Sequence, residues 1–108
     1  YIDDIVSGVI AALDAPPFKV DGEPPVRLYN IGNNSSEPLM RVIGLIEEQL
    51  GKKAEINFEP MQPGDVRETF ADIDLIHDEL GYSPQTPIDM GIPKFVEWFK
   101  ACGKTYNI

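Results

Sequence analysis

The sequence has little of the chemistry that builds metal sites and disulfides. Its 108 residues include one cysteine, Cys102, and one histidine, His77. A single cysteine excludes an internal disulfide, and one cysteine with one histidine cannot supply the ligands of a structural zinc site. Both absences are typical of a reducing compartment, so we expect a cytoplasmic protein.

Basic residues and long apolar runs are scarce as well. Nine Lys and Arg stand against 18 Asp and Glu, which gives a formal net charge of -9. A chain this acidic repels phosphate backbones, and no stretch approaches the roughly 18 consecutive apolar residues of a transmembrane helix. The start of the sequence also lacks the basic and apolar regions of a signal peptide. We therefore expect neither nucleic acid nor a membrane as a partner.

The length of the chain limits it to one small domain or to part of a larger one. With 108 residues it is too short for a complete dinucleotide-binding fold, which takes about 150 residues. A helical apolar pattern begins at Ile2, directly after the first residue. We expect the sequence to be the downstream part of a longer chain.

Four segments have the apolar spacing of amphipathic helices, with apolar residues three or four positions apart. These segments are residues 2–13, 39–50, 73–80 and 88–99. Ser36 and Asp72 are expected as N-caps of the second and third helices, and Gly51 and Gly81 as their C-caps.

The fourth helix has its own start and stop signals. Residues 86–89, Thr-Pro-Ile-Asp, resemble a capping box with proline at the first helical position. Pro93 should kink this helix or delay its start, because proline removes one backbone hydrogen bond. Gly103 is expected to end it.

Two further segments predict strands. Residues 26–31 are a strand candidate bounded by Pro25 and Gly32, and residues 54–58 alternate polar and apolar side chains. Two or three strands cannot make a self-sufficient sheet of ordinary size. The order helix, strand, helix, strand, helix, helix therefore predicts an α/β protein with few strands and four helices, whose strands need neighbours from elsewhere.

Two turns could carry a binding function. Residues 32–36 follow the first strand and precede a helix, a position where free backbone N–H groups can bind an anion. The alternative, a tight connection capped by Ser36, is the commoner situation for loops of this composition.

The second turn lies at residues 61–66, where Pro63 and Gly64 leave Gln62 and Asp65 three positions apart. A carboxylate accepts hydrogen bonds from sugar hydroxyls, and an amide donates to phosphate or base oxygens. The alternative is a Pro-Gly turn with solvated flanks.

The other chemically capable side chains favour ordinary roles. His77 lacks a nucleophile in its motif, and Cys102 near the end of the last helix is more typical of a bystander. Glu47 and Glu48 are helix neighbours that do not face each other, and most acidic residues are expected as caps and solvated faces. We find no paired-carboxylate active site.

Five motifs in order resemble one family. They are Tyr-Ile-Asp-Asp-Ile-Val at residues 1–6, Tyr-Asn-Ile-Gly at 29–32, Met-Gln-Pro-Gly-Asp-Val at 61–66, Phe-Ala-Asp at 70–72 and Leu-Gly-Tyr-Ser-Pro at 80–84. Each is weak alone, but their order and spacing are similar to the C-terminal third of extended short-chain dehydrogenase/reductases. Within that family the chain most resembles nucleotide-sugar epimerases of the UDP-glucuronate 4-epimerase type, often found in capsule or lipopolysaccharide gene clusters.

The resemblance implies a division of labour. Full-length members bind NAD on an N-terminal Rossmann sheet through a Gly-rich turn and use a Tyr-x-x-x-Lys pair for acid/base chemistry. This sequence contains neither motif. The resemblance therefore implies no catalytic, cofactor-binding or metal-binding residue here, NAD bound by the N-terminal part of the protein, and an inactive 108-residue chain.

The resemblance also implies which residues bind substrate. Asp65 matches the family's acid on the nucleotide ribose hydroxyls. Gln62 matches a position that is an arginine on the pyrophosphate in UDP-galactose epimerases, and glutamine there fits the glucuronate-type loop. A second family arginine would fall before Tyr1.

The resulting hypothesis is an epimerase fragment that contributes the UDP-sugar-binding lobe. Residues 1–35 would pack with the Rossmann domain, and residues 36–108 would form the nucleotide-sugar-binding lobe. The full-length protein is expected to be a homodimer. Two alternatives remain open: a nucleotide-sugar dehydratase or reductase of the same family, and a non-enzymatic binding module without the catalytic half.

Overall fold

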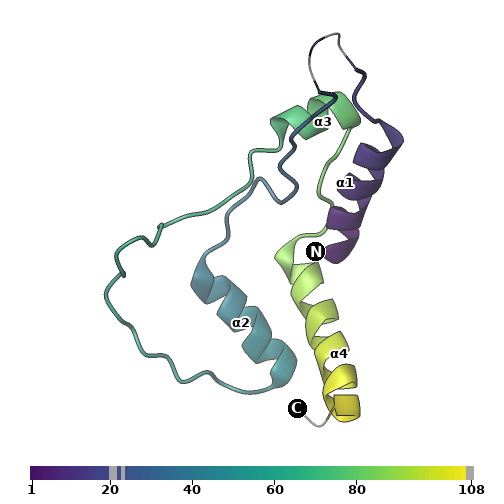
Figure 1. Ribbon diagram of the computed structural model, residues 1–108. Coiled ribbons are helices and arrows are strands. Elements are labelled where there is room, and N and C mark those ends of the chain that lie inside the picture. The colour runs from purple at the N-terminus through teal and green to yellow at the C-terminus, as the bar shows by residue number, and fades with distance from the viewer. Residues whose placement is uncertain (20–21, 23, 107–108) are drawn as a thin grey trace. The chain divides into compact units, whose positions relative to one another are not determined.

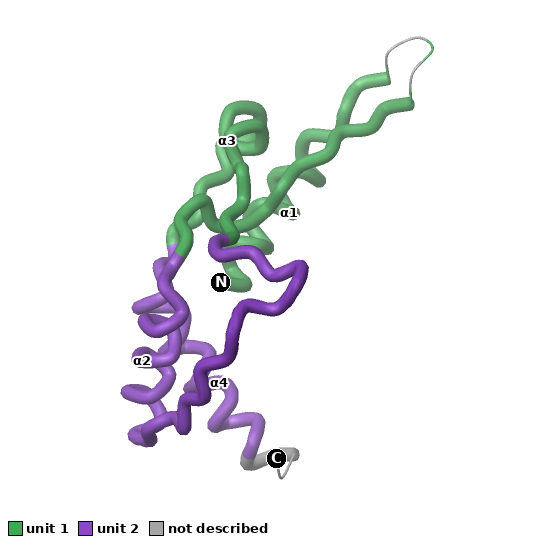
Figure 2. Tube along the Cα trace, turned by 90° about the vertical axis from the view of Figure 1, so that its left-hand side faces the viewer, with its two compact units in different colours: residues 1–36, 69–85 green, residues 37–68, 86–108 purple. Residues whose placement is uncertain are grey.

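A computed structural model of the chain describes residues 1–19, 22 and 24–106 (Figure 1). These residues form four helices: α1 (Ile2–Asp14), α2 (Leu39–Leu50), α3 (Asp74–Leu80) and α4 (Ile88–Tyr106). They fall into two compact units (Figure 2): unit 1 comprises Tyr1–Ser36 and Thr69–Gln85, and unit 2 comprises Glu37–Glu68 and Thr86–Ile108. No described helix combines the length and apolar character needed to cross a membrane.

The two expected strands are not formed in the described part of the chain. Residues 26–31 and 54–58 are irregular, and several of their apolar side chains face solvent, with Leu28 84% and Phe58 80% exposed, whereas Tyr29 and Ile31 pack against the core of unit 1. A strand is defined by its ladder of hydrogen bonds to a neighbour, and neither segment has such a neighbour among the described residues. The α/β class predicted from the sequence is therefore not confirmed on this chain.

Unit 1 holds a small core where residues 69–85 return against residues 29–33. Ile73, Ile76 and Tyr82 are buried there, with Ile76 fully enclosed. Four hydrogen bonds tie the two segments: Tyr82 Oη to the Gly32 carbonyl (3.0 Å), Asn30 Nδ2 to the Asp72 carbonyl (3.2 Å), the Ala71 N–H to the Asn33 carbonyl (2.9 Å) and Tyr29 Oη to Glu79 Oε2 (2.6 Å). The core thus joins parts of the sequence about 50 residues apart.

Helix α1 is attached to this part of unit 1 through Asp4, which is buried and only 7% exposed. Its Oδ1 accepts the backbone N–H of Gln85 at 3.1 Å, a contact between residues 81 positions apart. The same helix presents Gly8 to the core, where an added Cβ would lie 3.0 Å from Ile31 and 3.1 Å from Tyr82. A side chain at this position would therefore press against both neighbours.

Unit 2 is the pair of helices α2 and α4 with the long segment that follows α2 (Figure 1). Val96 on α4 is its one described residue that is buried. Lys100 Nζ donates to the Gln49 carbonyl at 2.6 Å, which links α4 to the last turn of α2.

The predicted helix ends are confirmed at Gly51 and Gly81 and are wrong at Ser36, Asp72 and Gly103. Gly51 and Gly81 cap α2 and α3 in the left-handed conformation, with φ of 65° and 70°. The N-cap of α3 is Ile73 rather than Asp72, although Asp72 Oδ1 accepts the N–H of Asp74, the first residue of α3, at 3.2 Å. Ser36 does not cap α2, which begins at Leu39 after Pro38, because a residue before proline is disfavoured in the helical region.

The fourth helix is longer than predicted. It begins at Ile88, so Pro93 lies inside it without delaying its start, and it continues past Gly103 to Tyr106. The Pro87 carbonyl accepts the N–H groups of Met90 and Gly91, both at 3.0 Å. A helical glycine costs only about 1 kcal/mol relative to alanine, which the rest of a long helix can offset.

Candidate functional site

The Pro-Gly turn forms in unit 2 as the sequence predicts. The Asp65 N–H donates to the Gln62 carbonyl at 3.1 Å, and Gly64 has φ of 96°. Proline followed by a glycine of positive φ is typical of a type II turn. In return, the Gln62 N–H donates to Asp65 Oδ2 at 3.2 Å, so the carboxylate is fixed across the turn.

The side chains of this turn face solvent. Gln62 and Asp65 are both exposed, and Gln62 Nε2 donates to the Pro60 carbonyl at 3.1 Å. Asp65 Oδ2 is used within the turn, whereas Oδ1 accepts no hydrogen bond from the described residues. The structure thus places one carboxylate and one side-chain amide on the same closed turn, both exposed to solvent. That pair can accept from a hydroxyl and donate to an oxygen.

The turn at residues 32–36 has a structural role in unit 1. The carbonyls of Gly32 and Asn33 accept from Tyr82 and Ala71, and Asn33 Oδ1 accepts the Ser35 N–H at 3.0 Å. Helix α2 begins only at Leu39, so this turn does not lie at a helix N-terminus. The turn is therefore neither capped by Ser36 nor placed as the anion-site hypothesis requires.

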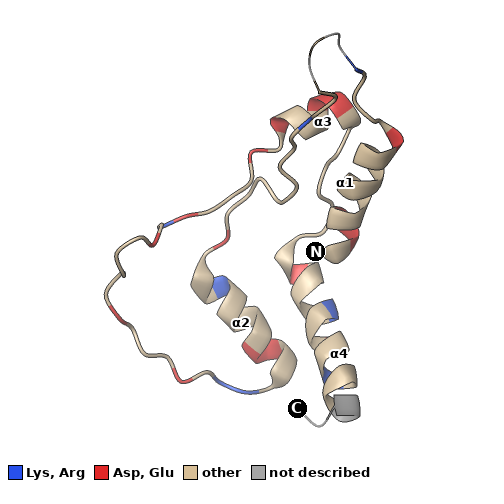
Figure 3. Cartoon of the chain, viewed as in Figure 1, with Lys and Arg blue, Asp and Glu red and all other residues tan. Residues whose placement is uncertain are grey.

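His77 and Cys102 show no catalytic arrangement in the described part of the chain. His77 Nδ1 lies 3.1 Å from Asp78 Oδ1, both on the exposed face of α3. Cys102 is a free, partly buried thiol on α4. Acidic residues are dispersed over both units (Figure 3), and no three metal-ligating side chains among the described residues could hold an ion together.

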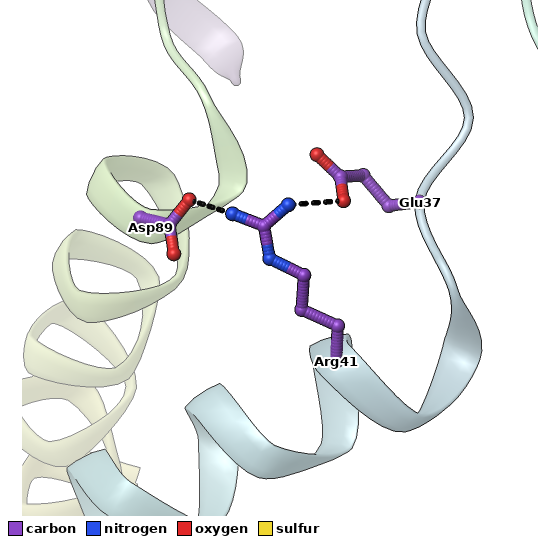
Figure 4. Close-up of polar contacts among 3 residues, drawn as sticks. All are labelled: Glu37, Arg41 and Asp89. Carbon is purple, nitrogen blue, oxygen red and sulfur yellow. Dashed lines mark hydrogen bonds and ion pairs between the residues drawn. The ribbon is translucent and has the colours of Figure 1, made fainter.

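One arginine joins the starts of α2 and α4 (Figure 4). The Arg41 guanidinium donates to Glu37 Oε2 at 2.7 Å and to a carboxylate oxygen of Asp89. All three side chains are partly open to solvent. This cluster is a surface clamp within unit 2.

Glu47 differs from the solvated-face role that the sequence suggested. Its side chain is only 14% exposed, and its carboxylate accepts from Lys53 Nζ at 2.6 Å and from the Ala54 N–H at 2.8 Å. The bond to Lys53 and then the bond to Ala54 hold the pKa of Glu47 below its ordinary value. The sequence contains a signal for this contact, because the C-cap at Gly51 turns the chain back toward the last turn of α2.

The chain is similar in sequence to several known proteins. None of the protein-family models matches it. It is 40% identical to protein CapI of Staphylococcus aureus over 110 residues, and 42% identical to UDP-glucuronate 4-epimerase 4 of Arabidopsis thaliana over 106 residues. Each match covers 92% of this chain, which spans 33% of the first protein and 24% of the second.

A solved structure agrees with these sequences. It is a crystal structure of a mutant UDP-glucuronic acid 4-epimerase from Bacillus cereus with UDP-4-deoxy-4-fluoro-glucuronic acid and NAD. The TM-score is 0.73 at 29% identity, over 94% of this chain and 31% of that one. The chain is therefore related to the nucleotide-sugar epimerases. Its particular resemblance is to the UDP-glucuronate 4-epimerases, as the five motifs predicted.

The described residues do not fit NAD. A dinucleotide is held by a Gly-rich turn between a strand and a helix. The described residues contain no strand, Gly51 and Gly81 end helices, and Gly64 lies in the Gln62–Asp65 turn. We therefore assign no NAD contact to this chain.

Proposed function

We propose that this chain contributes the UDP-sugar-binding part of an NAD-dependent nucleotide-sugar epimerase of the UDP-glucuronate 4-epimerase type. The observation that carries the proposal is the closed Gln62–Asp65 turn, with an exposed carboxylate and an exposed amide. The crystal structure of the B. cereus relative holds a UDP-sugar analogue, which supports this ligand class.

The turn suits a nucleotide chemically. Asp65 Oδ1 would accept from a ribose hydroxyl, and the Gln62 amide would donate to a diphosphate oxygen. Arg67 follows two residues later, is exposed and makes no ion pair with the described residues, so it can supply positive charge that Gln62 lacks. The turn is already closed, so binding costs little ordering of its backbone.

The assigned role is binding and orientation. The sequence has no Tyr-x-x-x-Lys pair and no Gly-rich dinucleotide motif, so we assign it no catalytic step. Residues 36–108 would form the substrate lobe and residues 1–35 would pack with a Rossmann domain. We expect a homodimer at full length and a cytoplasmic location.

One alternative to this proposal is a binding module that acts without a catalytic half. Incubation of the chain with UDP-glucuronate and NAD separates catalysis from binding. We expect no epimer above background. Turnover by the chain itself would overturn the assignment of a binding role.

The binding role is tested by titrating the chain with UDP and with 2′-deoxy-UDP in a calorimeter. We expect Asp65→Asn to bind UDP at least about tenfold more weakly, because a hydrogen bond to a charged group contributes roughly 1.5–3 kcal/mol. The variant should also lose the preference for UDP over the deoxy ligand.

The matched control is Glu59→Gln, which removes one negative charge from the same segment. Glu59 accepts only from Asn57 in the described residues, so this variant should keep both the affinity and the preference. Equal UDP affinity in wild type and Asp65→Asn would remove Asp65 from the site. A panel of UDP-sugars then tests the type: we expect UDP-glucuronate to bind more tightly than UDP-glucose.

A further inference from the structure

The segment that carries the candidate turn is poorly anchored along its length. Every residue from 51 to 70 is exposed. Within the described chain, the hydrogen bonds of residues 55–65 stay local: Asn57 to Glu59, Gln62 to Pro60, and the reciprocal pair of Gln62 and Asp65. These bonds shape the turn but do not fix where it lies relative to α2. Its position must be set at the ends of the segment.

The upstream end of this segment is held by one carboxylate on α2. Glu47 Oε2 accepts from Lys53 Nζ and Oε1 accepts from the Ala54 N–H, so both oxygens bind successive residues. The Glu47 carbonyl accepts the Lys52 N–H at 3.2 Å as well. Glu47 is largely buried, whereas Lys53 is 88% exposed. The chain therefore leaves α2 in a direction defined by Glu47.

We propose that Glu47 is a positioning residue for the nucleotide-binding turn. By holding Lys53 and Ala54 it sets the path of residues 55–65 and hence the place of Gln62 and Asp65. The role is indirect, since Glu47 acts on the ligand through Asp65. The inference rests on the proposed function, because it gives Glu47 a part in the binding of the same ligand.

Amide hydrogen exchange tests the anchor without any ligand. In Glu47→Ala we expect the Ala54 amide to exchange about tenfold faster, since it loses its acceptor, and residues 55–65 to change their amide chemical shifts. The matched control is Glu48→Ala, the exposed neighbour on the same helix, which should stay within about twofold of wild type. Unchanged exchange at Ala54 in Glu47→Ala would overturn the proposal.

A second variant protects this test against loss of the fold. Glu47→Gln keeps an oxygen that can accept from Ala54 and loses only the charge facing Lys53, so its effect should be smaller than that of alanine. Circular dichroism and exchange in α2 and α4 check that the helices remain. If the Ala54 amide exchanges at the wild-type rate in both variants while the helices remain intact, Glu47 does not hold this end of the segment.

Binding of UDP tests whether the anchor acts through Asp65. We expect Glu47→Ala to bind UDP about fivefold more weakly, and the double variant with Asp65→Asn to bind no more weakly than Asp65→Asn alone. Full additivity in the double variant, or wild-type UDP affinity in Glu47→Ala, would overturn the positioning role while the proposed function stands. If Asp65→Asn binds UDP like wild type, the proposed function fails, and with it the role of Glu47 in binding.

Discussion

Units 1 and 2 are held together by different kinds of contact. Unit 1 encloses Ile73, Ile76 and Tyr82 and uses buried hydrogen-bonding groups from distant parts of the sequence. Unit 2 buries Val96 among its described residues and relies on exposed ion pairs such as the Arg41 cluster. Burial stabilises far more than exposed charge pairs do. We infer that unit 1 is the stable frame, and that the candidate site lies in the unit whose contacts are weaker and easier to adjust.

The largest expected effect comes from emptying the core of unit 1. Ile76→Ala should destabilise the unit by about 2–4 kcal/mol, because Ile76 is 0% exposed and its removal leaves a cavity. Urea denaturation, followed by exchange of the Ala71 amide that bonds Asn33, measures the loss in this unit. Leu75→Ala, at a residue 49% exposed on the same helix, should cost less than about 1 kcal/mol. Equal costs at the two positions would mean that unit 1 has no specific core.

A pair of helical glycines contrasts the packing of the two units directly. Gly8→Ala should destabilise unit 1 by about 1 kcal/mol or more, because the new Cβ meets Ile31 and the buried ring of Tyr82 at close to 3 Å. Gly44→Ala should stabilise α2 by about 0.5–1 kcal/mol, since nothing lies within 4 Å of its Cβ position. Urea denaturation of both variants checks the opposite signs. Stabilisation by both would show that the close approach at Gly8 relaxes freely.

The hydroxyl of Tyr82 provides a smaller effect that depends on pH. Tyr82→Phe removes the bond to the Gly32 carbonyl and should cost about 1 kcal/mol at neutral pH. Burial and then the charge of Asp4 raise the pKa of Tyr82 above its ordinary value of 10. The neutral phenol is thus favoured by folding, so its contribution is complete below pH 10 and is lost as the pH rises through the folded pKa.

The pH effect has its own measurement. Stability curves of wild type and Tyr82→Phe, recorded by urea denaturation from neutral to alkaline pH, should converge above pH 10. The pKa of Tyr29 is also raised, mainly by its hydrogen bond to Glu79. Tyr29 is present in both proteins, so its titration affects both stability curves equally. A constant gap between the curves at all pH values would contradict the role of Tyr82 in this dependence.

The same contrast explains how far the sequence could predict the structure. Helices follow from apolar spacing and glycine caps, which are local signals, and α1, α2 and α3 lie where those signals put them. Strand pairing needs a partner that local sequence does not contain, and the strands expected at residues 26–31 and 54–58 are not formed in the described chain. The Gln62–Asp65 turn was predictable because Pro63 and Gly64 determine it locally.

Contacts over long separations account for what the sequence did not predict. The bond from Gln85 to Asp4 spans 81 residues, and no pattern within either segment marks it. The pattern of α2 alone predicts a solvated face for Glu47, because it does not include residues 52–54, which follow the helix. The reversal at Gly51, itself predicted, brings Lys53 and Ala54 back to that carboxylate. The Glu47 contact therefore follows from a local turn signal, whereas the Asp4 contact has no local signal.

The smallest expected effect tests the surface clamp of unit 2. Arg41→Gln breaks the pairs with Glu37 and Asp89 and should cost at most about 1 kcal/mol at low salt, since exposed ion pairs contribute little. The cost should vanish near 1 M salt, where the screening length is about 3 Å. Arg27→Gln is the matched control in unit 1, where a single pair with Glu79 at 3.3 Å should contribute less. A cost for Arg41→Gln that is large and independent of salt would mean that α2 and α4 are held as firmly as the core of unit 1. The Gln62–Asp65 turn would then be attached to a rigid support, and the proposed difference between the two units would not hold.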